Sequence, residues 1–472
     1  MEILSVGIDI GTTTTQLVAS RLVIENKASA FTVPRIHIVS KEIIYRSKVY
    51  FTPFLNELDI DGDGVYRIIQ TEYEAAGLTP DTVATGAVII TGEAARKQNA
   101  EMILTRLSSL AGQFVVSTAG PDLESIIAGK GSGACAYSKE HKCTAVNADI
   151  GGGTTNIAVY ENGETVSCTC IDIGGRQIRV EQGKITYISP SARRIAEDMR
   201  LGLELGQDAD LRKLTALTDR MAELIFLQMF EPGSDPLLEA VRTKSAGSIQ
   251  RPGRDAAVFL SGGVAACVFG NHHEDFPFGD IGVLLGRSIA KNHWFRESKV
   301  EHSAEMIRAT VVGAGVHLVS ISGSTITYTP DLLPLRNVPV LKLTDEEVAR
   351  WRSGDDGYIA DRLRWFSQAT DDPVLALGWN GWKSPTFKEI KEMAERVRNV
   401  YDAPDLKKLP IILIIEEDMA KSLGQSIRIL LPERKLICID SVGIREGDYV
   451  DLGSPIMNGV AIPVVVKTLV MG

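Results

Sequence analysis

The chain has 472 residues, of which 44% are hydrophobic and 23% charged, and its net charge is −10. This length predicts two or three packed units, and the mean hydropathy of +0.04 is that of a soluble globular protein. The acidic balance opposes binding to nucleic acid or anionic lipid, and no apolar stretch reaches the roughly 18 residues of a membrane helix. Without a basic, cleavable leader, we expect a cytoplasmic protein that binds neither nucleic acid nor membrane.

The first strand-turn-strand pattern covers residues 3–20, and its turn carries the first chemical signal. In GIDIGTTTTQL, Asp9 stands at the end of the apolar strand and is followed by Gly11 and then by Thr12, Thr13 and Thr14. Glycine lets backbone N–H groups approach phosphate oxygens, threonine hydroxyls add donors, and a carboxylate holds a hydrated cation. The loop therefore favours phosphate and magnesium binding, although a threonine-rich β-turn would share the pattern.

Helix and strand patterns alternate after this first loop. A helical pattern near residues 66–76 ends at Gly77. The first strand pair, this helix and the patterns that follow it predict an α/β lobe over residues 1–145. The remaining patterns of this lobe predict a strand at 87–92, a helix at 93–110, a strand at 114–120 and a glycine-rich helix at 123–136.

A second loop of the same kind stands at residues 146–160. In VNADIGGGTTNIAVY, an apolar strand ends at Asp149 and is followed by three glycines and two threonines. Two such loops at the ends of similar strands predict duplicated lobes that close on one ligand. The candidate ligand-binding residues of this loop are Gly151, Gly152, Gly153, Thr154 and Thr155.

The second lobe is expected to cover residues 146–330. A change of character over about 174–254 predicts an insertion with a short strand and two helices, at 191–206 and 213–230. A buried strand then runs into Ser261, Gly262 and Gly263, where the glycines would admit a flat ring; alone, this is more often a simple strand-to-helix turn. An apolar, small-residue helix is predicted at 307–322, and a separate C-terminal domain at 331–472.

The three loops, in this order, resemble the phosphate-1, phosphate-2 and adenosine motifs of the actin, heat-shock chaperone and sugar-kinase ATPase superfamily. The resemblance covers roughly residues 3–322. It implies an α/β fold with two actin-like, ribonuclease H-like lobes, a helical insertion and an additional C-terminal α/β domain. It also implies ATP and Mg²⁺ as cofactors.

The resemblance further implies a role for each loop residue. Asp9 would lie near the metal, Asp149 would orient a metal-bound or attacking water, and both are candidate catalytic and metal-binding residues. Residues 11–14 and 151–155 would hold the phosphates from opposite sides, and residues 261–263 would line the adenosine.

One residue departs from the superfamily pattern. Where chaperones carry a glutamate before the proline of the first connecting helix, this chain has Gly120 followed by Pro121. Asp122 or Glu124 would have to replace that carboxylate, and the sequence leaves the choice open. Slow hydrolysis or a weaker magnesium site is the expected consequence of the departure.

The whole chain resembles the ethanolamine ammonia-lyase reactivating factors nearly end to end. The resemblance rests on the three loops together with IITGEAARKQNA, FVVSTAGPDLESIIAGKGSGA, IRATVVGAGVHLVSISGSTI, PLRN and GDYVDLGSPIMNGVAIPVVVKTL. It implies an ATPase that acts like a molecular chaperone on one partner, ethanolamine ammonia-lyase. Such a factor releases damaged cobalamin so that adenosylcobalamin can enter, and it is associated with the bacterial microcompartment of ethanolamine utilisation.

Two other functions remain open at the level of sequence. A small-molecule kinase of the same fold would use Asp149 as the base that faces a hydroxyl acceptor. An actin-like scaffold would hold ATP as a structural ligand. Residues 191–230 and the tail beyond 330, which carry none of the loop patterns, are expected to contact the client or regulate the cycle.

Overall fold

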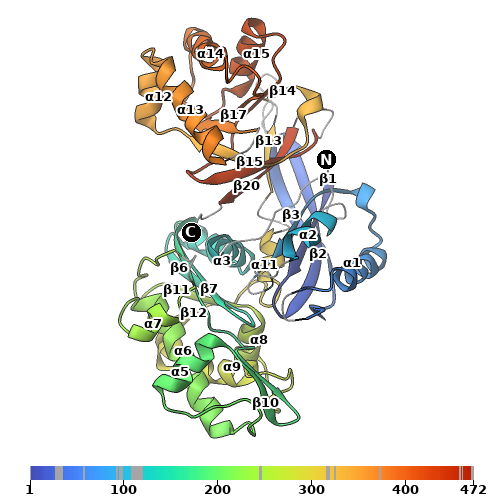
Figure 1. The fold of residues 1–472 in the computed structure, drawn as a ribbon, viewed down its shortest axis with the longest axis vertical. Helices are drawn as coiled ribbons and strands as arrows, with labels where there is room; N and C mark the ends of the chain where they lie inside the picture. The colour runs from blue at the N-terminus through green and yellow to red at the C-terminus, as the bar shows by residue number, and fades with distance from the viewer. Residues whose placement is uncertain are drawn as a thin grey trace.

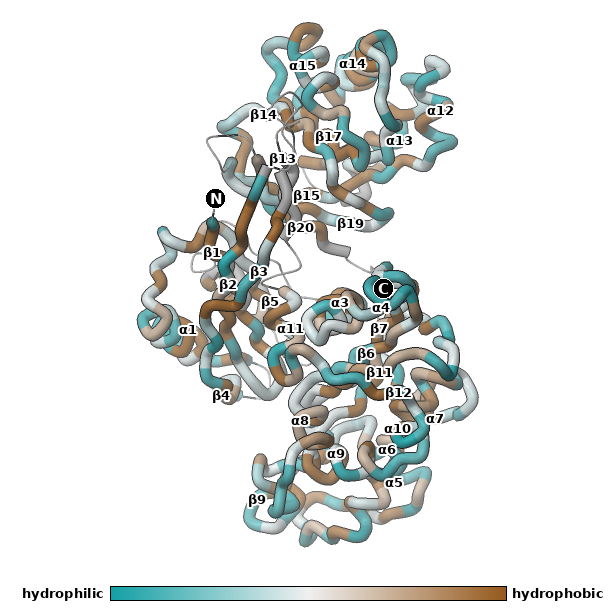
Figure 2. Tube along the Cα trace, turned by 180° about the vertical axis from the view of Figure 1, so that it is seen from behind, coloured by the Kyte–Doolittle hydropathy of each residue, from teal (hydrophilic) through white to brown (hydrophobic). Residues whose placement is uncertain are grey.

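The structure is a computed structural model, and it describes residues 2–26, 36–56, 59–91, 94, 99–107, 121–243, 247–314, 319–323, 326–370, 374–455, 459 and 461–468. The chain forms an elongated mixed α/β molecule, with a C-terminal region at one end, the second lobe at the other and the N-terminal lobe beside the middle (Figure 1). Hydrophobic residues follow the strands, and hydrophilic residues follow the outer helices and loops (Figure 2). No helix among these residues is long and apolar enough to cross a membrane.

The N-terminal lobe is built on a sheet whose first three long strands are antiparallel neighbours. The strand order is β3-β2-β1-β5, and β5 lies parallel to β1 on its other side. Helix α1 starts after Asp61, whose side chain caps it, and ends at Gly77 with a φ of 66°. The elements are β1 (Glu2–Ile10), β2 (Thr14–Asn26), β3 (Ile36–Arg46), β4 (Tyr50–Phe51), α1 (Gly62–Ala76), β5 (Val83–Ile90) and α2 (Ala100–Leu107).

The sheet of the second lobe repeats this topology. Strands β6, β7 and β8 are antiparallel neighbours, and β11 lies parallel to β6 on its other side, as β5 lies beside β1. The registers also agree, because Ile10 faces Thr15 at the end of the first hairpin and Ile150 faces Thr155 at the end of the second. The predicted two-lobed fold class is thereby confirmed. The strands are β6 (Thr144–Ile150), β7 (Thr155–Glu161), β8 (Glu164–Ile171), β11 (Ala257–Ser261) and β12 (Lys299–Val300).

Between β8 and β11, the chain forms the elements of the predicted insertion. They share one hydrophobic core with β6, β7 and β11. The first helix ends at Asp198, not at residue 206 as predicted, because Arg200 and Gly202 adopt left-handed conformations that break it. The elements are β9 (Ile178–Glu181), β10 (Lys184–Ile188), α5 (Pro190–Asp198), α6 (Leu211–Phe230) and α7 (Pro236–Val241).

Two helices cross between the lobes, α3 (Pro121–Gly131) and α11 (Ala309–Val312). The crossing requires glycine, because a Cβ on Gly131 would lie 1.8 Å from the carbonyl oxygen of Ala309. The helix predicted at 307–322 is largely wrong: among the described residues, helical turns stop at Ala314, and residues 319–323 form a strand. A short apolar run fits either structure, and antiparallel pairing with β20 decides for the strand. The remaining helices of this half are α4 (Ala134–His141), α8 (Gly263–Phe269), α9 (Gly282–Lys291) and α10 (His293–Glu297).

The C-terminal region forms an eight-stranded mixed sheet in the order β13-β20-β19-β15-β16-β17-β18-β14. Strands β15 to β18 are parallel, and Trp351 and Trp379 pack edge to face at 5.8 Å in the core under the helices. The sheet begins before residue 330, where the sequence predicts a boundary. Its strands are β13 (Val319–Gly323), β14 (Thr327–Tyr328), β15 (Leu335–Lys342), β16 (Ala376–Trp379), β17 (Ile411–Ile415), β18 (Leu436–Ile439), β19 (Asp448–Leu452) and β20 (Ala461–Thr468), and its helices are α12 (Asp345–Arg352), α13 (Asp356–Thr370), α14 (Phe387–Tyr401) and α15 (Ala420–Leu430).

This C-terminal sheet touches the helix that joins the lobes. Val465 of β20 belongs to the same buried cluster as Ile89 of β5 and as Leu123 and Ile127 of α3. Strand β13 also lies beside β3 of the N-terminal lobe. The C-terminal sheet is therefore in contact with α3, which joins the lobes, and with strands β3 and β5 of the N-terminal lobe.

Candidate functional site

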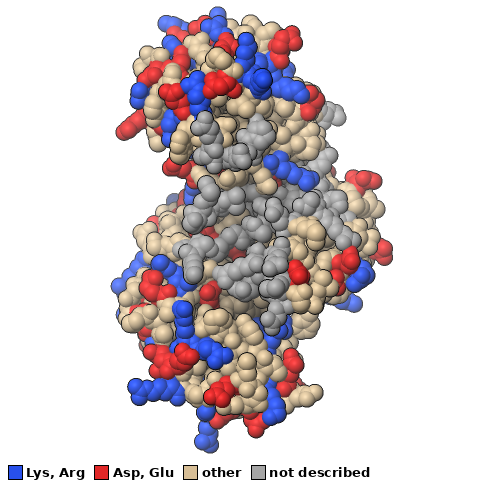
Figure 3. Space-filling model, in the orientation of Figure 1, with Lys and Arg blue, Asp and Glu red and all other residues tan. Residues whose placement is uncertain are grey.

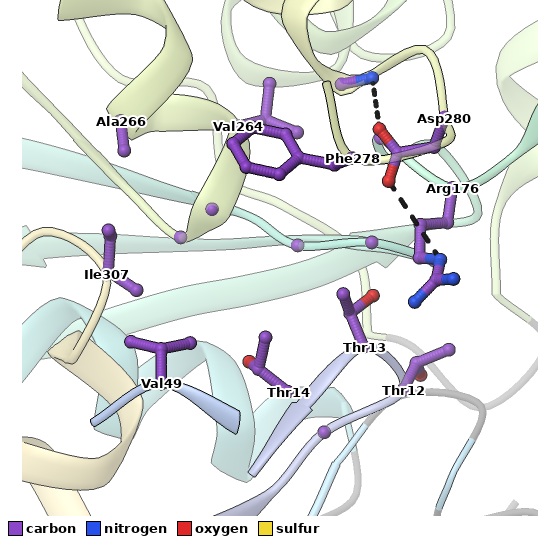
Figure 4. A pocket seen from close by; sticks show the side chains of 18 of the residues that line it. Thr12, Thr13, Thr14, Val49, Arg176, Val264, Ala266, Phe278, Asp280 and Ile307 are labelled. Carbon is purple, nitrogen blue, oxygen red and sulfur yellow. Dashed lines mark hydrogen bonds and ion pairs between the residues drawn. The ribbon is translucent and has the colours of Figure 1, made fainter. Parts of the chain in front are cut away.

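A cavity of about 540 Å³ lies where the two lobes meet. The Asp-Gly-Thr loops of both lobes face it, as does the turn between β11 and α8, and Figure 4 shows side chains from these segments converging on one space. The prediction that Asp9 and Asp149 share one cavity is therefore confirmed. The predicted residues that line it are Asp9, Gly11, Thr12, Thr13, Thr14, Asp149, Gly151, Gly152, Gly153, Thr154, Gly262 and Gly263.

The first loop is closed by hydrogen bonds to its backbone, and of its threonine hydroxyls only that of Thr14 accepts a bond among the described residues, from the side chain of Gln16 at 3.3 Å. The N–H of Gly11 donates to the carbonyl of Thr14 at 2.9 Å, and Thr52 donates its N–H to Thr13 and its hydroxyl to Gly11. The side-chain oxygens of Thr12 and Thr13 are buried and have no hydrogen-bond partner among the described residues. Buried hydroxyls are normally paired, so these two indicate a missing polar partner.

The second loop is held by the segment after β8. Gly175 and Arg176 donate their N–H groups to the carbonyls of Gly151 and Gly152, at 3.0 and 2.7 Å, and the side chain of Gln177 donates to the carbonyl of Gly153. In a trans peptide the N–H points opposite to the C=O. The N–H groups that follow these three carbonyls therefore point away from this segment, where an anion could accept them.

The two loops are in direct contact at Gly152. A Cβ on this residue would lie 2.0 Å from Oγ1 of Thr13 and 3.5 Å from Cδ of Arg176. Any other side chain would have to displace the threonine. The close approach of the loops therefore depends on glycine at this position.

Both carboxylates of the site are buried, with exposed fractions of 9% for Asp9 and 6% for Asp149. Burial raises the pKa of Asp9 to about 7. A hydrogen bond from Thr91 opposes this rise in pKa, and the negative charge of Asp149 adds to it. Burial also raises the pKa of Asp149, against hydrogen bonds from Ser261 at 2.6 Å and Thr310 at 3.3 Å. A cation placed between the two carboxylates would offset both effects.

Two of the predicted ligand-binding side chains lie behind the cavity. The hydroxyl of Thr155 donates to the carbonyl of Ile173 at 2.8 Å. The hydroxyl of Ser261 donates to Asp149 and is buried beside Asn147. Thr155 therefore ties the start of β7 to the segment after β8, and Ser261 holds the Asp149 carboxylate in place.

The two candidates for the missing carboxylate lie in different environments. Glu124 of α3 lines the cavity, whereas Asp122 accepts a hydrogen bond from the N–H of Gly247 at 3.1 Å. Gly120 lies outside the described residues. Of the two, Glu124 is therefore the one in position to face a metal or its water.

Several lining residues were not predicted. Phe278, Val264 and Ala266 form an apolar end of the cavity near Gly262 and Gly263. On the side of the cavity that carries Phe278, Arg176 lies 3.9 Å from Asp280, whose other oxygen accepts from the N–H of Gly282. No local pattern marks these side chains, because they come from helix α8 and from turns that lie far apart in the sequence.

Two lobes of equal topology, each contributing an acidic strand end and a glycine loop to a shared cavity, define a protein of the two-lobed actin-like ATPase fold. The family described as "Ethanolamine utilisation protein EutA" matches residues 1–472. The chain is 36% identical over 480 residues to the ethanolamine ammonia-lyase reactivase EutA of Salmonella typhimurium, with 99% of this chain and 98% of that protein covered. The Escherichia coli reactivase EutA is 36% identical over 481 residues, with the same coverage. The chain belongs to the EutA family.

Solved structures resemble the chain only distantly. A Ppx/GppA family protein of Aquifex aeolicus has a TM-score of 0.39 at 13% identity, and the match covers 66% of this chain and 97% of that one. The ethanolamine utilisation protein EutJ of Carboxydothermus hydrogenoformans has a TM-score of 0.32 at 16% identity, and the match covers 66% and 89%. These similarities are too low to transfer a function.

Proposed function

We propose that this chain reactivates ethanolamine ammonia-lyase, using ATP and Mg²⁺ to release damaged cobalamin so that adenosylcobalamin can take its place. The observation that carries the proposal is the 36% identity, over 99% of the chain, to two proteins named ethanolamine ammonia-lyase reactivase. We place the protein in the cytoplasm, in association with the microcompartment of ethanolamine utilisation. Acidic and basic side chains are interspersed at both ends of one face (Figure 3), as suits a protein partner better than nucleic acid.

The residues of the cavity fit a magnesium nucleotide. The volume of about 540 Å³ suits a small-molecule ligand, and the unpaired hydroxyls of Thr12 and Thr13 are donors suited to phosphate oxygens. Mg²⁺ commonly takes one or two carboxylates together with substrate phosphates, as Asp9 and Asp149 would allow. Gly262 and Gly263 would border the adenosine beside the apolar end of the cavity.

When bound, ATP supplies the free energy of its hydrolysis and Mg²⁺ offsets the charge of the phosphates. Asp9 would hold the cation, and Asp149, fixed by Ser261 and Thr310, would orient the attacking water. Glu124 would provide the carboxylate that chaperones carry at the position of Gly120. The glycine loops hold the phosphates through backbone N–H groups, which requires no change of protonation.

Contacts between the lobes and the C-terminal sheet offer a route from the nucleotide to the client. Glu124 lines the cavity, and the neighbouring Leu123 and Ile127 of the same helix pack against Val465 of β20. A movement of α3 on lobe closure would therefore reach the C-terminal sheet. We assign client contact to that region and to the helices of the insertion.

The test uses ethanolamine ammonia-lyase that has been inactivated with a bound cobalamin lacking its adenosyl group. We expect added chain, ATP, Mg²⁺ and adenosylcobalamin to restore activity, and the omission of ATP or Mg²⁺ to prevent recovery. Full recovery without ATP hydrolysis would refute the coupling. ATP turnover that requires a small alcohol or sugar would favour the kinase, and ATP-dependent polymers that sediment would favour the scaffold.

A further inference from the structure

Arg176 is the only lysine or arginine that lines the cavity among the residues that the structure describes. The other charged side chains there are acidic, namely Asp9, Glu124, Asp149 and Asp280. A nucleotide triphosphate adds further negative charge to such a site. Among these acidic groups, the positive charge of Arg176 therefore has a large effect on how strongly the cavity attracts a phosphate.

The backbone holds Arg176 firmly, whereas its side chain is held weakly. Its N–H donates to Gly152 at 2.7 Å, and the neighbouring Gly174 has no room for a side chain, since a Cβ there would lie 2.5 Å from the Gly152 carbonyl oxygen. The Nε atom, in contrast, has no hydrogen-bond partner among the described residues and lies 3.9 Å from Asp280. An arginine donor paired at that distance is free to form a shorter bond to another acceptor.

The guanidinium group extends from the second lobe toward the first. Figure 4 shows it turned toward Thr12 and Thr13 of the first phosphate loop. It also lies 5.9 Å from the ring centre of Phe51, a residue of the first lobe that is 63% exposed. Arg176 thus stands beside the two hydroxyls that lack partners and contacts elements of both lobes.

We propose that Arg176 binds the terminal phosphate of ATP and thereby distinguishes ATP from ADP. With the terminal phosphate present, the guanidinium leaves Asp280 and joins the first loop to the second; without it, the side chain returns to Asp280 and Phe51. This inference rests on the proposed use of ATP. It assigns to one residue the difference between the two nucleotide states that a reactivation cycle needs.

The test compares the affinities of the full chain for a non-hydrolysable ATP analogue and for ADP, both with Mg²⁺, by isothermal titration calorimetry. Arg176→Gln should weaken the analogue ~10- to 100-fold, as expected for loss of a charge-assisted hydrogen bond, and ADP less than ~3-fold. Arg176→Lys should retain part of the preference, because a lysine keeps the charge but not the fork of donors.

Arg251→Gln is the matched control, since Arg251 lies outside the cavity, 3.7 Å from Glu231, and loses the same charge away from Arg176 and Asp280. It should leave the preference for the analogue unchanged. If Arg176→Gln melts like the wild type and weakens the binding of both nucleotides equally, or weakens neither, the inference about Arg176 is overturned while the proposed function stands. A wild-type chain that binds neither nucleotide would overturn the proposed function as well.

Discussion

The two glycine loops of the cavity share a backbone turn but present different chemical groups. Gly11 donates to Thr14 in the first loop and Gly151 donates to Thr154 in the second, both at 2.9 Å. The first loop continues with Thr12 and Thr13, whose hydroxyls have no hydrogen-bond partner in the described part of the chain, and Thr52 donates to two of its carbonyls. The second continues with bare glycines whose carbonyls are taken by residues 175–177.

The carboxylates beside these loops differ in the same way. Within the described residues, Asp9 accepts one side-chain hydrogen bond, from Thr91, whereas Asp149 accepts bonds on both oxygens, from Ser261 and Thr310. A carboxylate held at two points is better oriented for positioning water, and one held at a single point keeps an oxygen for a cation. The two loops therefore share one backbone shape but present different groups, which is consistent with the separate roles that we propose for Asp9 and Asp149.

The largest effect should come from Asp149→Asn. This change keeps the volume and one of the two accepted hydrogen bonds, turns the other into a bond that the amide NH2 donates to a hydroxyl, and removes the charge that orients or deprotonates water. We expect ATP turnover to fall ~100- to 10,000-fold while ATP affinity stays near the wild-type value. Steady-state hydrolysis and calorimetry on one preparation measure both, and near-normal turnover would contradict the role of Asp149.

A second prediction concerns the stability of the nucleotide-free protein. Because burial raises the pKa of Asp9 from 3.8 to about 7, the folded state gains a proton that the unfolded state has lost, and stability falls as the pH rises between these values. Asp9→Asn should therefore stabilise the apo protein at pH 8, by up to about 4 kcal/mol, and by less at pH 5. Urea unfolding at both pH values tests this, and destabilisation at pH 8 would show that Asp9 is already neutralised in the fold.

A third prediction concerns the pH dependence of magnesium-dependent binding. Mg²⁺ requires the ionised carboxylate, so the Mg²⁺-dependent part of ATP affinity should rise ~10-fold from pH 6 to pH 8 and level off above about 7. Asp9→Asn should lose this part of the affinity and its pH dependence. Titrations with Mg²⁺ and with EDTA give the difference, and an equal pH dependence in the variant would assign the titration to another group.

The smallest effect should separate two neighbouring glycines. Gly152→Ala should weaken ATP binding ~10-fold, because its Cβ would push against Thr13 at 2.0 Å and separate the loops. Gly151→Ala is the control, since its Cβ would lie at an ordinary 3.5 Å from the carbonyl oxygen of Thr154. We expect the control to change the affinity less than ~3-fold, and similar losses in both variants would mean that loop contact has no special importance.

The parts of the site that the sequence predicted are those encoded within one turn. Asp9, Gly11 and Asp149 lie at the cavity as expected, because a strand end followed by glycine and threonine defines its own loop. The helix predicted at 307–322 failed for the opposite reason, since the run VSISG at 319–323 becomes a strand only by pairing with β20, far along the chain. Thr155 and Ser261 belong to correctly predicted segments, yet their side chains point away from the cavity. Neighbouring side chains along a strand face opposite ways, but only the packing of the lobe decides which of them face the cavity.

The sequence by itself determined the family, the two similar lobes and the two glycine loops, because these depend on local turn chemistry and on similarity spread over the whole chain. Only the tertiary structure decided that Glu124 and not Asp122 faces the cavity, and that Arg176 pairs with Asp280 beside the first loop. The physical reason is that these placements follow from how α3 and the turns of the second lobe pack against the first. Such packing brings together side chains that no local pattern connects.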